Sequence, residues 1–395
     1  MPDMPFPHTH AVPALPGYDE AWLSAHGGFW TAREIAQQPD LLRRTQDLLG
    51  AQQTKIEAFL APLLARPDLR IILTGAGTSA FIGDSLAPWL TARMQRPVES
   101  IATTDLACAP DLYFAKAAPT LLVSFGRSGN SPESLAVVDL ADQCVSEIHH
   151  LVITCNADGE LARFAEGHAR GFGLLLPEET HDRSFAMTSS FSCMTYAALA
   201  MFSGIDAMPS RNAALSAAVA EVIETRLPFL QQVVAEDYDR VVYLGSHIFK
   251  GLAREAGLKL LELTNGGIAT LFDSTLGFRH GPKTFVTGRT LVIIFVSNDP
   301  YTRQYDIDLL DELRRDGEAG RVIAVTAQDG LEAYDHIRIQ GMEEAQDIDL
   351  IFPYIAVAQI FAFQQSLKRG LTPDQPNIKG TVNRVVQGVQ IYKRT

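Results

Sequence analysis

Two glycine-containing loops carry hydroxyl and guanidinium groups of the kind that bind phosphate. Gly77-Thr78-Ser79 follows the apolar run 70–74, and Arg127-Ser128-Gly129-Asn130-Ser131 follows the apolar run 120–124. A helical pattern begins after each loop, and a helix N-terminus offers free N–H groups and a partial positive charge. Glycine lets the backbone approach an anion closely, while hydroxyl and guanidinium groups donate hydrogen bonds. The candidate substrate-binding residues are therefore Thr78, Ser79, Arg127, Ser128 and Ser131, although either loop alone also fits an ordinary capped turn.

The spacing of these loops does not indicate a nucleotide cofactor. Gly75-x-Gly77 is followed by Ala80 where a dinucleotide-binding loop has its third glycine, and no GxxxxGK[ST] loop is present. The sequence thus indicates neither a dinucleotide nor ATP, and no cofactor is expected.

A second set of candidates lies on the helical segment 251–264. Glu255, Lys259 and Glu262 are separated by four and three residues, so they share one helix face. Leucine or alanine fills most of the remaining positions, which favours a largely buried helix. Charges on a buried helix must pair with each other or serve a site. The pattern alone leaves an exposed Glu–Lys stripe equally open.

Two further residues attract attention only in combination with the first ones. His280 stands in the turn Arg279-His280-Gly281-Pro282, where an isolated histidine is more often a surface residue. Lys379 lies in the polar segment Pro376-Asn377-Ile378-Lys379-Gly380.

The elements that must position these residues follow an α/β pattern. Strand, polar turn and helix repeat, which predicts parallel sheets with helices on both faces, and the order restarts once along the chain. The predicted strands are Arg70–Thr74, Thr120–Ser124, His150–Thr154, Phe172–Leu176, Arg240–Leu244, Thr290–Val296 and Arg321–Val325. The predicted helices include one that opens with the capping box Thr31-x-x-Glu34, a long stretch over 184–234 and a final helix over 350–365.

The domain organisation follows from this restart. Residues 1–50 are expected to form an N-terminal extended segment, up to residue 28, and a helix. Residues 51–214 form a first α/β domain that binds the phosphate, and 215–395 form a second with a C-terminal tail.

Composition excludes several classes of partner. The chain has 395 residues, 47% of them hydrophobic, and a formal net charge of -13. A surface this acidic argues against nucleic acid or anionic membrane as a partner. The sequence contains no uninterrupted apolar stretch long enough to span a membrane, so no membrane span is expected. The N-terminus lacks a signal pattern, so a cytoplasmic location is expected.

The cysteines and histidines do not predict a metal site. The four cysteines, Cys108, Cys144, Cys155 and Cys193, are far apart and form no CxxC pair. They fit reduced core residues of a cytoplasmic protein. No ligand cluster has the spacing of a zinc or magnesium site, so no metal is expected.

Taken together, these segments resemble the SIS family of sugar-phosphate isomerases, and within it the AgaS-type galactosamine-6-phosphate deaminase/isomerase subgroup, also described as tagatose-6-phosphate ketose/aldose isomerase. The likeness rests on the segments 30–39, 124–134 and 245–282, and it covers most of the chain from about residue 25. It implies two SIS domains, each a flavodoxin-like three-layer α/β/α unit.

Similarity to the isomerase domain of glucosamine-6-phosphate synthase implies roles for single residues. Glu262 would move the proton between C1 and C2, and His280, from the neighbouring subunit, would assist ring opening. Lys259 and Lys379 would contact the open-chain sugar. The chain departs from the synthase at Arg279, which replaces a lysine, at Gly126, which replaces a serine, and at Thr188-Ser189-Ser190, which replaces a Thr-Lys pair. The synthase's glutaminase domain has no counterpart.

The expected function is that of a metal-free aldose–ketose isomerase and deaminase, a hydrolase of amino sugar metabolism that works as a homodimer or higher homo-oligomer. Galactosamine 6-phosphate would give tagatose 6-phosphate and ammonia. Isomerisation of tagatose 6-phosphate itself and deamination of glucosamine 6-phosphate are the enzymatic alternatives. A non-catalytic sugar-phosphate-sensing SIS protein is the third, and the acidic charge and short N-terminal segment oppose it.

Overall fold

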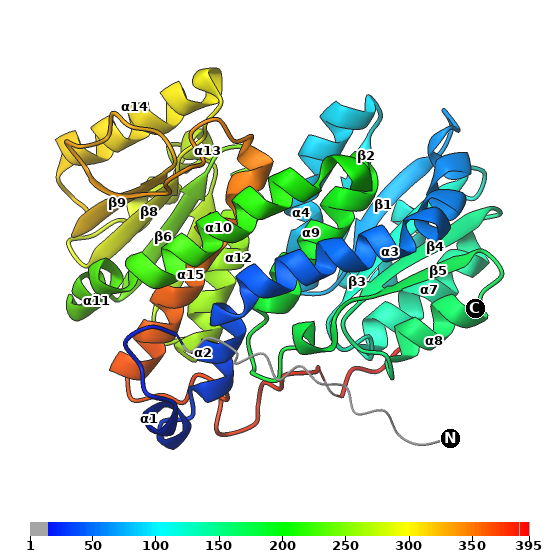
Figure 1. Ribbon diagram of the computed structural model, residues 1–395, viewed down its shortest axis with the longest axis horizontal. Coiled ribbons are helices and arrows are strands. Elements are labelled where there is room, and N and C mark those ends of the chain that lie inside the picture. The colour runs from blue at the N-terminus through cyan, green and yellow to red at the C-terminus, as the bar shows by residue number, and fades with distance from the viewer. Residues whose placement is uncertain (1–14, 387, 395) are drawn as a thin grey trace.

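Two five-stranded parallel sheets organise the computed structural model, which describes residues 15–386 and 388–394 (Figure 1). The first sheet has the order β2-β1-β3-β4-β5 and the second the order β10-β9-β8-β6-β7. Read from the opposite edge, the second order is the first one with five added to each label. Both are the flavodoxin-like order 2-1-3-4-5, so the predicted fold class and its duplication are confirmed.

The strands of the first sheet are β1 (Arg70–Thr74), β2 (Val98–Ser100), β3 (Thr120–Gly126), β4 (Ile148–Thr154) and β5 (Gly171–Leu175). Those of the second are β6 (Arg240–Gly245), β7 (Ala269–Asp273), β8 (Thr290–Phe295), β9 (Arg321–Thr326) and β10 (Asp335–Arg338). All neighbouring strands pair in parallel, for example with Arg70 opposite Thr120 and Arg240 opposite Thr290.

The α-helices are α1 (Glu20–Ala25), α2 (Phe29–Ala36), α3 (Gln38–Leu64), α4 (Thr78–Met94), α5 (Thr103–Cys108), α6 (Pro110–Tyr113), α7 (Pro132–Cys144), α8 (Glu160–Gly167), α9 (Ser189–Ser203), α10 (Pro209–Thr225), α11 (Leu227–Ala235), α12 (Ile248–Leu263), α13 (Thr275–Phe278), α14 (Pro300–Asp316) and α15 (Asp347–Lys368). Short 3₁₀ turns are η1 (Glu178–Thr180), η2 (Ile205–Ala207) and η3 (Pro282–Phe285).

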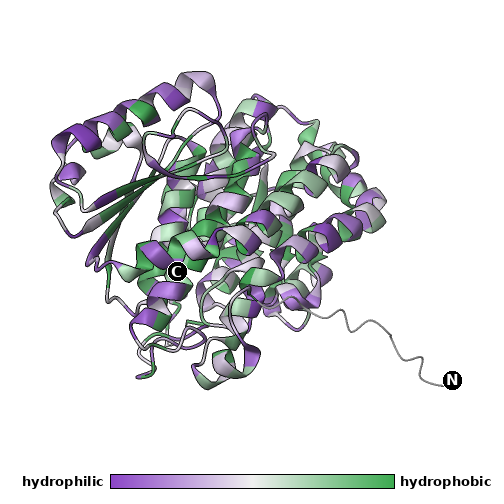
Figure 2. Ribbon diagram, turned by 60° about the vertical axis from the view of Figure 1, so that its left-hand side comes forward, coloured by the Kyte–Doolittle hydropathy of each residue, from purple (hydrophilic) through white to green (hydrophobic). Residues whose placement is uncertain are grey.

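Alternate residues of each strand enter different cores, as parallel strands buried on both faces require. Leu73 of β1 joins a large central core, whereas Ile72 joins a separate core on the outer face of the first sheet. Val241 and Val242 of β6 divide in the same way between the central core and an outer core of the second sheet. The inward helices α3, α4, α9, α10, α12 and α15 fill the space between the sheets, and apolar residues concentrate there (Figure 2).

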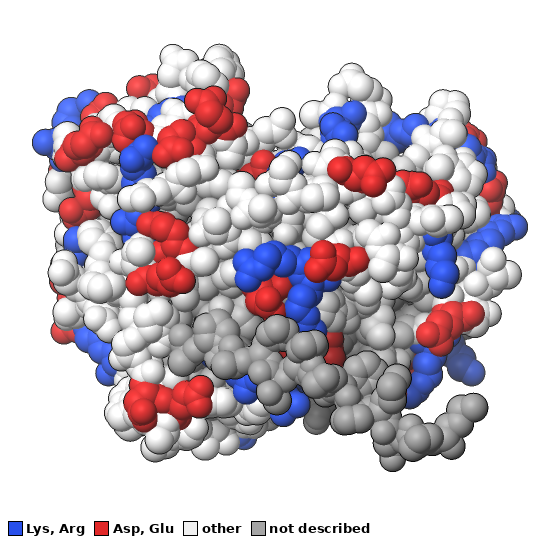
Figure 3. Space-filling model, viewed as in Figure 1, with Lys and Arg blue, Asp and Glu red and all other residues white. Residues whose placement is uncertain are grey.

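Helix α15 is the described helix whose length and apolar content suffice to cross a membrane. Of its most apolar 18-residue window, 94% is buried inside the protein. That is the behaviour of a core helix. On the face shown in Figure 3, acidic and basic side chains are interspersed, with acidic residues gathered over α14.

Several predicted boundaries are wrong. The segment through residue 28 was expected to be extended, but α1 forms there because the Asp19 carboxylate accepts the N–H of Trp22 at 2.9 Å and Leu23 is buried. Residues 1–14 lie outside the described part. The capping box is also wrong, because Thr31 and Glu34 both lie inside α2, whose N-cap is Gly28.

The predicted strands all form, to within two residues at either end, while β2, β7 and β10 were not predicted. The helical stretch over 184–234 is divided into α9, α10 and α11, and α9 begins only at Ser189. The domain boundary near residue 215 falls within α10, and this division of the chain stays a prediction.

Candidate active site

Helices α4 and α12 pack against each other in opposite directions, and their crossing forms the centre of the site. Thr78, at the start of α4, meets Lys259 in the second half of α12. Further along α4, Ser85 meets Gly251 near the start of α12, where an added Cβ would lie 2.6 Å from the Ser85 backbone nitrogen. Only glycine permits this approach. It brings the first loop against the charged face of α12.

Glu255, Lys259, Glu262 and Thr78 form one connected polar cluster. The Lys259 Nζ lies 2.6 Å from Glu262 Oε2, 3.4 Å from Glu255 Oε1 and 2.9 Å from Thr78 Oγ1. The Thr78 hydroxyl in turn donates to Glu255 Oε1 at 3.2 Å. The side chains of Glu255 and Lys259 are fully buried, whereas that of Glu262 is 24% exposed. The exposed-stripe alternative for this helix is therefore wrong, and Glu262 is the carboxylate that solvent reaches.

Burial and charge act against each other in this cluster. Burial alone would lower the pKa of Lys259, but the neighbouring Glu255 and Glu262 outweigh it and leave that pKa raised. Burial raises the pKa of Glu255 to about 8, in spite of the opposing charge of Lys259. The two acidic neighbours thus favour the cationic form of Lys259.

Both phosphate-loop candidates lie at the switch point of the first sheet, where β1 and β3 are neighbours. In a flavodoxin-like sheet, ligands bind outside the carboxyl ends of these two strands. Gly77, the N-cap of α4, has a φ of 57°, which favours glycine, and Ser131 is the N-cap of α7. Neither helix has a side-chain cap, so no side chain competes with an anion for the helix N-terminus. Pro132 at the start of α7 has no N–H, and the N–H groups of Ser79 and Ser134 donate to the carbonyl oxygens of Ala76 and Ser131.

The equivalent switch point of the second sheet lies between β6 and β8, and its helices are capped. The His247 ring accepts the N–H of Ile248 at the start of α12. The Asp299 carboxylate accepts the N–H of Thr302 at 2.8 Å at the start of α14. The side chains of His247 and Asp299 thus occupy these two helix ends, and that of Asp299 is negatively charged. An anion is expected at the first switch point and not at the second.

The Arg127 guanidinium binds backbone carbonyl oxygens. Its Nη1 donates to the carbonyl oxygens of Ser184 at 3.1 Å and Phe185 at 3.0 Å, and its Nη2 donates to the carbonyl oxygen of Arg384 at 2.7 Å. Arg127 is only 7% exposed. It therefore tethers the segment after η1 and the C-terminal segment to the second loop, and its contact with a phosphate stays a prediction.

The serines of the loops remain close to the switch point. Ser128 Oγ accepts the N–H of Asn130 at 3.3 Å, and Ser131 Oγ lies 2.6 Å from Ser134 Oγ. Ser79 is 5% exposed, with its Oγ 4.0 Å from the sulfur of Met187. All three lie in the predicted loops.

The structure does not bring His280 to Glu262 within one chain. Ser246, just before α12, has its Oγ 2.7 Å from that of Thr275 in α13, which places the His280 turn at the first end of α12. Glu262 lies in the last turn of that helix. With a rise of 1.5 Å per residue, about 20 Å of helix separates the two positions. His280 is exposed, and its ring has no hydrogen bond among the described residues.

Lys379 lies at the other end of α12. The Asn377 Nδ2 donates to Asn265 Oδ1 at 3.0 Å, which holds the C-terminal segment beside the residues that follow α12. Lys379 itself is exposed and does not join the Lys259 cluster.

Three carboxylates near the site were not predicted to take part in it: the buried Glu34 and Asp182 and the half-buried Asp374. The Asp182 carboxylate accepts the N–H groups of Thr188 at 2.8 Å and Ser190 at 2.9 Å. Glu34 accepts from the N–H groups of Arg183 and Ser184. Glu34 and Asp182 therefore shape the segment that Arg127 holds from its other side.

Asp374 connects the two ends of the chain. Its carboxylate accepts the N–H groups of Trp30 at 3.1 Å and Thr31 at 2.8 Å, and so caps α2. Its carbonyl oxygen accepts the N–H of Phe185 at 3.0 Å. The C-terminal segment thus supplies the cap that the predicted capping box did not.

Stability should fall with rising pH through Glu34. Burial, with Asp182 beside it, raises the pKa of Glu34 to about 8, well above its value in an unfolded chain. Between the two values the folded state holds a proton that the unfolded state has lost, so stability declines as pH rises and the loss is complete above the folded pKa. Glu34→Gln keeps an acceptor and removes the titration. The Tm of this variant should fall less than that of the wild type between about pH 5.5 and pH 9. The exposed Glu57→Gln should behave as the wild type, and equal pH slopes for Glu34→Gln would contradict the assignment.

Among the described residues, one group has the side chains of a metal site: Asp142, His150 and His168. Asp142 Oδ1 lies 3.0 Å from His150 Nε2 and 3.3 Å from His168 Nε2. The His168 Nδ1 accepts the N–H of Arg170 at 3.1 Å, so in the neutral ring the proton is on Nε2 and faces the carboxylate. This pattern fits a carboxylate shared by two imidazoles. The group also lies toward the start of β4, away from the switch point.

Comparisons with known proteins show the family to which the chain belongs. The family model of the SIS domain matches residues 63–204. The chain is 48% identical over 374 residues to D-galactosamine-6-phosphate deaminase AgaS from Escherichia coli, covering 93% of this chain and 97% of that one. It is 45% identical to the protein of the same name from Shewanella sp. (strain ANA-3), covering 94% and 93%. A solved structure of tagatose-6-phosphate ketose/aldose isomerase from Escherichia coli superposes with a TM-score of 0.88 at 44% identity, covering 96% of this chain and 100% of that one. The chain belongs to the AgaS family of SIS-domain proteins.

Proposed function

We propose that this chain is an enzyme that isomerises and deaminates a hexosamine 6-phosphate, converting galactosamine 6-phosphate to tagatose 6-phosphate and ammonia. The observation that carries the proposal is the buried Lys259 cluster beside the first phosphate-loop candidate. A cation fixed between two carboxylates, one of which reaches solvent, suits proton transfer next to an anchored anion. The names of the relatives, deaminase and isomerase of sugar phosphates, support the same reaction.

Binding would begin with the phosphate. The uncapped first turns of α4 and α7, with the backbone N–H of Thr78 and the hydroxyls of Ser79, Ser128 and Ser131, would hold the 6-phosphate. The sugar carbons would then extend toward Glu262, the exposed member of the cluster. No metal ion or organic cofactor is required for this binding, and the substrate is a small molecule.

The reaction follows from a base beside C2. After ring opening the sugar is an aldehyde at C1 with an amine at C2. Glu262 removes the C2 proton and returns a proton to C1, and one amine proton passes to the C1 oxygen, which leaves a hydroxymethyl group at C1 and a ketimine at C2. Water adds to the ketimine carbon and ammonia leaves, giving the ketose. Lys259 stabilises the oxygen anion that develops during enolisation, and Lys379 from the adjacent C-terminal segment contacts the open chain.

Ring opening requires a residue that the single chain does not place at Glu262. We assign this step to His280 of a second copy, because the turn that carries His280 lies about 20 Å along α12 from Glu262. The working unit would be a cytoplasmic homodimer with two composite sites. The position of the turn supports this role. Arg279 pairs with Glu312 at 2.7 Å and holds the turn in place, while the His280 ring stays exposed.

A panel of sugars tests the function. Galactosamine 6-phosphate should release ammonia with the highest kcat/KM, ahead of glucosamine 6-phosphate, and tagatose 6-phosphate should form as the other product. Unphosphorylated galactosamine should be a very poor substrate because it lacks the group that the two loops would bind. Equal turnover of galactosamine and its 6-phosphate would contradict the proposal. If the sugars are turned over without release of ammonia, the reaction is plain isomerisation and not deamination.

A further inference from the structure

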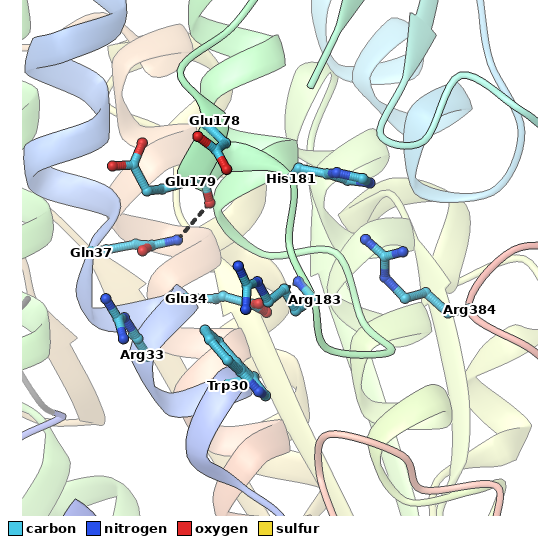
Figure 4. A pocket seen from close by; sticks show the side chains of 9 residues that line it. All are labelled: Trp30, Arg33, Glu34, Gln37, Glu178, Glu179, His181, Arg183 and Arg384. Carbon is cyan, nitrogen blue, oxygen red and sulfur yellow. Dashed lines mark hydrogen bonds between the residues drawn. The ribbon is translucent and has the colours of Figure 1, made fainter. Parts of the chain in front are cut away.

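A cavity with a volume of about 570 Å³ lies between α2, η1 and the C-terminal segment (Figure 4). Its lining includes three arginines, Arg33, Arg183 and Arg384, together with Trp30, Glu34 and His181. None of the residues of the Lys259 cluster lines it. The cavity is therefore a separate place on the protein, with the size of small-molecule sites.

None of these three arginines forms an ion pair with an acidic side chain among residues 15–386 and 388–394, although Arg384 donates to the carbonyl oxygen of Asp182 at 2.9 Å. The guanidinium of Arg183 lies 4.4 Å from the centre of the Trp30 ring, and that of Arg33 lies 5.6 Å from it. Figure 4 shows both side chains converging on Trp30, while Arg384 enters from the opposite side. Stacking on an aromatic ring holds a guanidinium in place and leaves its N–H donors available.

The acidic groups of the cavity are engaged by other partners or exposed to solvent. The oxygens of Glu34 accept from the backbone N–H groups of Arg183 and Ser184. Glu179 pairs with Arg44 at 2.7 Å. Glu178 is exposed at the rim. Cationic donors thus outnumber unengaged carboxylates inside the cavity, in a chain whose net charge is -13.

We propose that this cavity is a second anion site that binds a small phosphate monoester, distinct from the site that would hold the substrate. Planar guanidinium forks match the geometry of phosphate oxygens, and Arg33 and Arg183 present two such forks to one space. The ordinary function of such a site is regulatory, since the ligand undergoes no chemistry there.

The floor of the cavity connects it to the catalytic loop. Glu34 holds the backbone of Ser184 from the cavity side, and the Ser184 carbonyl oxygen accepts from Arg127 on the other side at 3.1 Å. Arg127 directly precedes Ser128 of the second phosphate loop. A ligand that orders Arg183 therefore acts on a segment one residue from the tether of that loop.

Phosphate stoichiometry tests the proposal without relying on activity. Equilibrium dialysis with radiolabelled inorganic phosphate should give one bound equivalent fewer for the double variant Arg33→Gln/Arg183→Gln than for the wild type. Each single variant should weaken this equivalent at least about tenfold, the usual effect of losing a charged hydrogen bond. The matched control is Arg43→Gln, which removes the same charge from an exposed position on α3 outside the cavity.

A second pair of substitutions keeps this site apart from the catalytic one. Ser128→Ala/Ser131→Ala should lose a different equivalent and retain the one that needs the arginines. Methyl phosphate should compete at the arginine site as a monoester. An unchanged number of equivalents in Arg33→Gln/Arg183→Gln overturns the proposal. Both arginines are at least partly exposed, so the variants should fold, and unaltered melting curves would verify this.

Discussion

Replacing Glu262 with glutamine should lower kcat by about 10²- to 10⁴-fold, the usual contribution of a general base. Glutamine keeps the size and an acceptor oxygen for Lys259, whose Nζ lies 2.6 Å from the native carboxylate, but it takes up no proton. Lys259 also retains Glu255 at 3.4 Å, so the variant should stay folded. The measurement is steady-state turnover of galactosamine 6-phosphate together with exchange of a C2 deuterium with solvent, which should stop.

The matched control for this variant is Glu166→Gln, which makes the same chemical change at an exposed position on α8. It should leave kcat and C2 exchange unchanged. Near-normal kcat in Glu262→Gln, with a normal melting curve, would exclude Glu262 as the base. The proton would then have to be moved by another group, and Glu255 would be the next to test.

Mixing two inactive variants should restore activity if the sites are shared between subunits. Glu262→Gln and His280→Ala are each expected to be inactive as homodimers. In a mixed dimer one site combines the intact Glu262 of one chain with the intact His280 of the other, so up to about half of the wild-type activity should return. The structure favours this outcome because about 20 Å of helix separates the two positions in one chain.

The experiment requires subunit exchange, which mass measurement of the mixture can verify. Mixtures of Glu262→Gln with Glu262→Gln/His280→Ala serve as the control, because no pairing of these chains contains an intact site. If mixed dimers of the two single variants form and no activity returns at any ratio, the hypothesis of a shared site is wrong. His280 would then have only a structural role in its own turn.

Much of the fold could be predicted because its central strands are continuous apolar runs. β1 and β8 are buried nearly throughout, and their sequences are almost entirely apolar. β7 is an edge strand with a half-exposed pattern, and β2 has only three residues, so neither presents a run or a clear alternation. Helix α1 escaped prediction because proline and glycine precede it, while its stability comes from Asp19 and from the burial of Leu23.

The loops and the charged face of α12 could be predicted because their residues are close in sequence. The sequence could not predict which of these charges would be buried, because their burial depends on how α4 crosses α12. Arg127 illustrates a different limit. A guanidinium beside a glycine loop suits a phosphate, but it suits backbone carbonyl oxygens equally, and here it binds three of them. The role of Asp182 could not be predicted from a motif, because a carboxylate that binds backbone N–H groups needs no particular neighbours in the sequence.

The cap of α2 has a consequence for how the protein is made. Thr31 and Asp374 are 343 positions apart, and the same aspartate fixes Phe185 in the segment that Arg127 holds. At the usual rates of synthesis, roughly 5 to 20 residues per second, α2 leaves the ribosome between roughly 17 and 70 s before its cap exists. The first sheet can form during translation, but the wall of the site closes only when the last few dozen residues emerge. A nascent chain stalled before residue 374 should therefore contain the folded sheet without a finished site.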